Sequence, residues 1–72
     1  MGRHFYTNQE VLEEARVLIY IPGASTYTVA KELNRSQATI WRHLNHRLPE
    51  IDLDLCHRVR VILRKNYKGG GR

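Results

Sequence analysis

Apolar residues recur in the first third of the chain at the spacing of a helix that packs one face on a core. The stripe consists of Val11, Leu12, Ala15, Leu18 and Ile19. Thr7, followed three residues later by Glu10, forms a capping box that predicts where this helix begins. Pro22 and Gly23 end it. Its polar residues are expected to face water: Glu10, Glu13, Glu14 and Arg16.

The next pattern is two short helices joined by a very short turn. The first covers residues 27–33, with Thr26 as the expected N-cap and Val29, Ala30 and Leu33 facing inward. Asn34 favours the left-handed conformation that closes a helix. Ser36 then caps a second helix over residues 37–45, which Ile40 and Leu44 anchor to the core. Helices joined this closely must cross steeply, so the pattern predicts a helix-turn-helix with the small Ala30 at the crossing.

A fourth helix is expected over residues 53–67, capped by Asp52. Residues 48–51 are expected to form a turn, because Pro49 disfavours helix in the residue before it. The inward face of the fourth helix consists of Leu55, Val59, Ile62 and Leu63, with Cys56 beside them. The outward face carries His57, Arg60, Arg64 and Lys68, flanked by Arg58 and Lys65. Val61 lies among these charges with no predicted packing partner.

These patterns predict an all-α fold, a small helix-turn-helix bundle of about four helices. Residues 1–6 form an N-terminal arm, residues 7–67 the domain and residues 68–72 a flexible, basic, glycine-rich tail. The chain has 72 residues, of which 42% are apolar, so it supports one modest core and no enzyme-sized fold. A single cysteine forms no internal disulfide, and no apolar run approaches the ~20 residues that span a membrane. We therefore expect a cytoplasmic protein.

Charge divides the chain into two unlike halves. Residues 1–32 carry three basic and four acidic residues, a net of −1, and residues 33–72 carry nine basic and three acidic residues, a net of +6. The total of +5 on so small a domain is typical of proteins that bind nucleic acid or an anionic membrane surface. A polyanion would be drawn to the second half of the chain.

The outward face of the helix over residues 37–45 holds the candidate chemistry. Arg42 suits guanine O6 and N7, Gln37 suits adenine N6 and N7, and Ala38 is short enough to approach a thymine methyl group. The residues expected to read bases are Gln37, Ala38, Trp41, Arg42 and Asn45. Those expected to contact phosphate are Tyr27, Ser36, Thr39, Arg60, Arg64, Lys65 and Lys68. No cofactor is expected.

Residues 26–44 and the segment that follows resemble the stage III sporulation protein D family, which are bacterial helix-turn-helix transcription regulators. Three motifs carry the resemblance: Ala30-Lys31-Glu32, Ser36 with Thr39, and Arg47-Leu48-Pro49-Glu50-Ile51. It implies binding to double-stranded DNA as a monomer. Because the chain shows no heptad zipper, we expect a monomer or weak dimer, associated with the nucleoid, with RNA polymerase or other regulators as further partners. The resemblance also implies base contacts from Gln37, Ala38, Trp41 and Arg42, and backbone contacts from Arg64, Lys65 and Lys68.

The chain differs from this family at positions in the turn and in the helix that is expected to read the DNA sequence. The family usually has Gly-Val in the turn, Lys-Ser in the first turn of the recognition helix and His-Lys further along. The residues here are Asn34-Arg35, Gln37-Ala38 and Trp41-Arg42. The family's basic C-terminal segment is also shortened. The resemblance therefore implies a fold and does not imply a target sequence.

Other interpretations stay open from the residues alone. Trp41 could be a core residue or a hot spot for a protein partner, and the basic fourth helix could dock on anionic lipid or form an ordinary solvated face. His43, His46, Cys56 and His57 fit no strong metal-ligand spacing, so we expect no metal, with His43 a partly buried imidazole. No catalytic constellation is recognisable in the chain, which argues against an enzyme.

Overall fold

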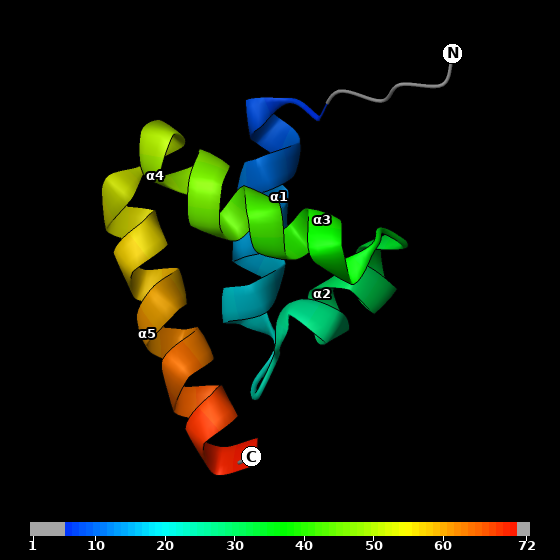
Figure 1. The fold of residues 1–72 in the computed structure, drawn as a ribbon, viewed down its shortest axis with the longest axis vertical. Helices are drawn as coiled ribbons and strands as arrows, with labels where there is room; N and C mark the ends of the chain where they lie inside the picture. The colour runs from blue at the N-terminus through cyan, green and yellow to red at the C-terminus, as the bar shows by residue number, and fades with distance from the viewer. Residues whose placement is uncertain (1–5, 71–72) are drawn as a thin grey trace.

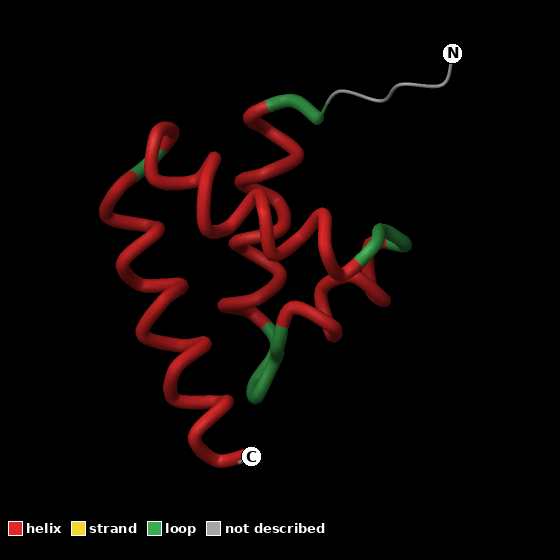
Figure 2. The backbone as a smooth tube through the Cα atoms, viewed as in Figure 1, coloured by secondary structure: helices red, strands yellow, loops and turns green. Residues whose placement is uncertain are grey.

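Helical segments follow one another along the chain in the computed structural model, which describes residues 6–70 and the side chains of residues 6–66. They are α1 (Asn8–Tyr20), α2 (Thr26–Leu33), α3 (Gln37–Arg42), the π-helix η1 (His43–Arg47), α4 (Leu48–Ile51) and α5 (Leu53–Gly70). Short loops join them, and no strand occurs in the described residues (Figure 2). The all-α fold predicted from the sequence is confirmed.

α1 begins as the capping box predicts. The Glu10 backbone N–H donates to the Thr7 hydroxyl at 3.2 Å, and the Thr7 backbone N–H donates to the Glu10 carboxylate at 2.7 Å. The helix ends before Pro22, and Gly23 has a φ of 75°, which a side chain would strain. Local signals therefore set both ends of α1.

α2 begins one residue earlier than predicted. Ser25, and not Thr26, is the N-cap. Its hydroxyl accepts the Thr28 backbone N–H, and the Thr28 hydroxyl accepts the Ser25 backbone N–H. These two hydrogen bonds pair two backbone N–H groups that have no partner within the helix. Thr26 is then the first residue of the helix, and it is fully buried. Asn34 closes α2 with φ 56° and ψ 51°, the left-handed conformation that was predicted.

The turn predicted at residues 48–51 is wrong. Leu48 has helical dihedrals, and the chain stays helical from α3 through η1 into α4. Proline clashes with the carbonyl four residues back in a regular helix but is tolerated in a first turn. Bonds in η1 run across five residues, as from the Leu48 N–H to the His43 carbonyl, so Pro49 lies in the first turn of the segment that follows.

α5 begins where Asp52 caps it, because the Leu55 backbone N–H donates to the Asp52 carboxylate at 3.0 Å. The helix continues to Gly70, past the predicted end at residue 67 and into the segment predicted as a flexible tail. The side chain of Lys68 and residues 71–72 lie outside the described part of the chain.

The core lies where all the helices meet. In Figure 1, α3 crosses in front of α1, α2 lies beside their crossing, and α5 runs along the opposite side of the molecule. The apolar side chains buried there belong to Val11, Ala15, Leu18, Ala24, Val29, Ala30, Ile40, Leu44, Leu48, Cys56 and Val59. Cys56 is thus part of the inward face of α5. No helix of the described chain is both long and apolar enough to cross a lipid bilayer.

Candidate nucleic-acid interface

α2, residues 34–36 and α3 form the helix-turn-helix that the sequence predicts. Ala30 is buried where the two helices cross, and Val29 and Ile40 are fully buried beneath them. Leu44 lies in η1, directly after α3, and its buried side chain attaches the C-terminal end of α3 to the core. The outer face of α3 is therefore held by packing at both ends, turned away from α1 (Figure 1).

Four side chains project from that outer face. Ala38, Trp41, Arg42 and His46 are exposed, and Trp41 keeps 48% of its surface accessible. Trp41 and His46 meet edge to face, with ring centroids 5.6 Å apart. Trp41 is therefore not a core residue, and it forms an exposed aromatic pair with His46.

Two predicted base-reading residues already have partners within the protein. The Asn45 side-chain amide donates to the Trp41 backbone carbonyl at 2.8 Å, so it folds back along the helix. Gln37 is half-buried, and its Nε2 donates to the Thr26 hydroxyl at 2.9 Å. The outer face thus presents Arg42 freely and Gln37 in a fixed orientation.

The predicted phosphate contacts near the turn differ in their accessibility. Ser36 accepts the Thr39 backbone N–H at 3.0 Å and donates its own hydroxyl to that of Thr39 at 2.7 Å, so both hydroxyls take part in the cap. Tyr27 is 67% exposed, on the second residue of α2. Tyr27 and Ser36 are thus exposed, and Thr39 is half-buried.

The basic residues of α5 lie on two different edges of the helix. Cys56 marks one edge, since its thiol lies 3.8 Å from the Leu44 carbonyl of η1. At about 100° per residue, Arg60 and Arg64 fall toward the Cys56 edge, whereas Arg58 and Lys65 fall on the opposite edge. All four are exposed. By this helical spacing, Arg60 and Arg64 lie closer than Arg58 and Lys65 to the edge on which Cys56 approaches η1.

The far end of α5 is attached to the start of the helix-turn-helix. The Asn66 side-chain amide donates to the Ala24 backbone carbonyl at 2.6 Å, directly before the Ser25 cap of α2. This bond joins the basic helix to the N-terminal end of α2. The two elements that were predicted to contact DNA are thus held in one rigid arrangement.

Glu14, expected to face water, is fully buried. Its carboxylate lies 2.9 Å from Nη1 of Arg35, in the turn between α2 and α3, and 2.9 and 3.0 Å from Nδ1 of His43, where α3 passes into η1. Helical periodicity places Glu14 beside the apolar stripe, and two nitrogen partners make its burial possible. This carboxylate on α1 thereby holds both ends of α3.

Arg35 joins the rest of the acidic helix to the turn. Its Nη2 pairs with Glu13 at 3.2 Å, its Nη1 donates to the Glu10 backbone carbonyl at 3.4 Å, and its guanidinium lies 5.1 Å from the ring centre of Tyr6. Tyr6 in turn packs edge to face on His43, with centroids 4.8 Å apart. The acidic residues in α1 and the basic residue in the turn were visible in the sequence, but nothing local indicated that they meet.

Arg47 is a second basic residue used inside the fold. It donates to the Tyr6 backbone carbonyl at 2.6 Å and to the Asn8 side chain at 3.2 Å. These bonds attach the end of η1 to the start of α1. Arg35 and Arg47 therefore hold α3 and η1 in place, and neither was predicted from the sequence to do so.

Burial raises the pKa of Glu14 above its ordinary value, although the hydrogen bonds and charges of His43 and Arg35 act in the opposite direction. Removing a carboxylate from water disfavours its charged form, and here that cost exceeds the gain from its partners. The carboxylate at the centre of the fold thus titrates at higher pH than one in water.

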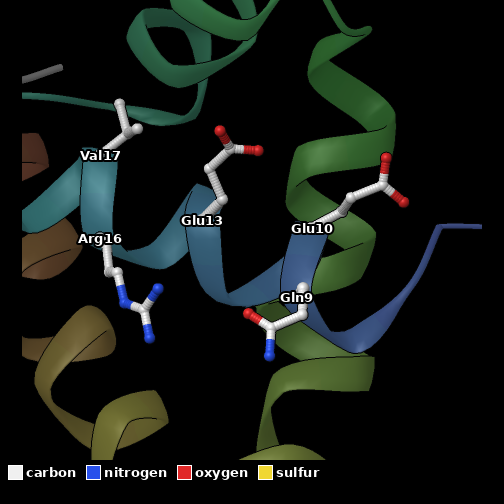
Figure 3. Close-up of a pocket in the computed structure, with 5 residues that line it drawn as sticks. All are labelled: Gln9, Glu10, Glu13, Arg16 and Val17. Carbon is white, nitrogen blue, oxygen red and sulfur yellow. The ribbon is translucent and has the colours of Figure 1, made fainter.

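The outward face of α1 is a shallow acidic surface. A hollow of about 390 Å³ is lined by Gln9, Glu10, Glu13, Arg16 and Val17. Figure 3 shows these side chains pointing outward from α1, with the α3 side of the molecule behind the helix. Glu10 and Glu13 of this hollow also pair with Arg35, in the turn before α3.

In the described part of the chain, no group of three or more His, Cys, Asp or Glu side chains is arranged to hold a metal ion. Comparisons with protein-family models, curated proteins and solved structures found no match to this chain.

Proposed function

We propose that this protein is a sequence-specific regulator of transcription that binds double-stranded DNA through its helix-turn-helix. The observation that carries the proposal is the outer face of α3, where Ala38, Trp41 and Arg42 are exposed on a helix fixed at both ends. The B-DNA major groove admits one α-helix and presents a different pattern of groups for each base pair. A rigid helix with these side chains suits that groove.

Arg42 is the main base-reading residue in this proposal. Its exposed guanidinium can donate two parallel hydrogen bonds to guanine, a contact that discriminates by about 1–3 kcal/mol. Ala38 and Trp41 supply apolar surface for thymine methyl groups. Arg60 and Arg64, on the edge of α5 toward η1, contact phosphate and provide affinity that does not depend on sequence.

The distribution of charge supports the same orientation on DNA. The second half of the chain carries a net +6, and the outward face of α1 carries Glu10 and Glu13. A duplex is attracted to the α3 side and repelled by the α1 face. The resemblance to the stage III sporulation protein D family adds a monomer or weak dimer in the nucleoid, working with RNA polymerase or other regulators.

Selection of bound sequences from a random duplex pool tests the proposal. We expect an enriched motif, and we expect Arg42→Ala to weaken binding to that motif by about 1–3 kcal/mol more than binding to random DNA. Arg58→Ala is the matched control, because it removes an equally exposed arginine from the far edge of α5. Affinities are measured by fluorescence anisotropy at one fixed salt concentration.

Two results would contradict this function. A pool with no enriched motif removes sequence-specific binding, and equal losses on both DNAs remove Arg42 from base reading. The rival interpretations predict different outcomes: co-sedimentation with anionic liposomes indicates lipid binding, and a protein partner retained after nuclease treatment indicates a protein-interaction module.

A further inference from the structure

Gln37 and Thr26 join the first residues of the two helices of the helix-turn-helix. Nε2 of Gln37 lies 2.9 Å from Oγ1 of Thr26. Thr26 is fully buried and its backbone begins α2, so its hydroxyl has little freedom to move. Gln37 is half-buried at the start of α3, so part of its amide stays accessible at the tip of the recognition helix.

The hydrogen bond decides what the Gln37 amide can still offer. A glutamine amide has two N–H donors and one carbonyl acceptor. Thr26 accepts one N–H, so the second N–H and the carbonyl oxygen remain. That pair, one donor beside one acceptor, complements N7 and N6–H of adenine in the major groove.

With the opposite orientation, the Gln37 amide would be complementary to a different base. If the carbonyl oxygen faced Thr26, only the two N–H groups would remain outward, and they complement the two acceptors of guanine, N7 and O6. The amide is therefore ambiguous by itself. In the structure Nε2, and not the carbonyl oxygen, faces Oγ1 of Thr26, and this contact selects the first orientation.

We propose that Thr26 is a specificity-determining positioning residue, which orients the Gln37 amide so that the recognition helix reads an adenine. This inference rests on the proposed function and extends it to one base at one position. Thr26 touches no base itself. It acts through Gln37, whose ordering before binding also reduces the entropy that is lost on the DNA.

Four variants of the full chain test the assignment by selection from a random duplex pool. Gln37→Ala identifies the position that Gln37 reads, as the one where the wild-type preference disappears. Thr26→Val keeps the shape of the side chain and removes the acceptor, Thr26→Ser keeps the hydroxyl, and Thr26→Val with Gln37→Ala completes a double-mutant cycle. Thr26→Ala replaces the valine variant if thermal unfolding shows that valine prevents folding.

We expect adenine at the Gln37 position in the wild-type motif. Thr26→Val should lower the preference for adenine over guanine there about tenfold, within the range of a bidentate contact, while other positions keep their preferences. Thr26→Ser should retain the preference. Thr26→Val should have no further effect on that position in the Gln37→Ala background.

The inference is overturned if the Thr26→Val protein keeps its adenine preference, if all positions weaken together, or if Gln37→Ala changes no position. It is also overturned if the Gln37 position selects another base. In each case the wild-type motif still stands, and with it the proposed function. A wild-type protein that enriches no motif removes the proposed function and this inference together.

Discussion

Glu14 brings a carboxylate into the core and meets the side chains of Arg35 and His43 there. An unpaired charge in that place would cost several kcal/mol, so each partner is needed for the carboxylate to remain buried. Arg35 comes from the turn before α3 and His43 from its end. A single residue of α1 thus joins both ends of α3 to the core.

The raised pKa of Glu14 predicts how stability depends on pH. The native state holds this proton more tightly than the unfolded chain, so its contribution is complete below the ordinary pKa of 4.5 and is lost as pH rises through the native value. Glu14→Gln has no such proton. The free energy of unfolding of the wild type minus that of Glu14→Gln should therefore decrease from pH 4 to neutrality, as measured by urea denaturation.

Glu13→Gln provides the control for this measurement. Glu13 pairs with the same arginine, but its side chain is 52% exposed, so its removal should cost less than about 1 kcal/mol. A difference between wild type and Glu14→Gln that grows with pH would show that the partners outweigh burial, and that the direction of the pKa change is opposite to the one stated here.

At the scale of the elements, the turn between α2 and α3 is held at three consecutive residues. Asn34 is exposed and adopts the left-handed conformation, while the next two residues pair with α1 and cap α3. No regular helix could pass through this point. The backbone angle at Asn34 therefore sets the direction in which α3 leaves α2.

Substitution at Asn34 measures the cost of that angle. Asn34→Ala should lower the free energy of unfolding by about 1 kcal/mol, because a β-carbon without a short polar group disfavours the left-handed region. Asn34→Gly should be neutral or stabilising, since glycine adopts this region freely. Urea denaturation of the three proteins checks the order, and an alanine variant as stable as the glycine variant would contradict it.

On the scale of the whole molecule, basic residues serve two separate purposes. Arg35 and Arg47 are used inside the protein, where they attach the recognition helix to α1. Arg60 and Arg64 stay exposed on α5, toward the edge that Cys56 marks. The net charge of the second half therefore overstates the charge available to a polyanion, and the position of each residue decides its role.

This division predicts different salt dependences for two arginines of α5. Arg60→Ala should reduce the slope of log affinity against log salt by about 0.9, the value for one phosphate contact, on preferred and random DNA alike. Arg58→Ala, on the other edge, should leave the slope unchanged. Anisotropy titrations over a series of salt concentrations measure both, and equal slopes for the two variants would remove Arg60 from the interface.

The start of α1, the end of α2, the cap of α3 and most inward positions were predictable because their causes lie within a few residues. Thr7 and Glu10 are three apart, as are Ser36 and Thr39, and Asn34 favours its conformation through its own side chain. The apolar stripe of α1 follows from a period of 3.6 residues. The sequence alone therefore determined the all-α class, the helix-turn-helix and the outward placement of Ala38 and Arg42, whereas the exposure of Trp41 came from the structure.

Only the tertiary structure decided what lies between the helices. Glu14 meets His43 across 29 residues of sequence, Arg47 reaches Tyr6 across 41, and Gln37 finds Thr26 across 11. Pro49 continues a helix because η1 precedes it, where a local rule predicts a turn. The physical reason is the same throughout. The energy of a buried charge or amide depends on the groups that packing brings beside it, and the periodicity of apolar residues along the chain does not indicate which groups these are.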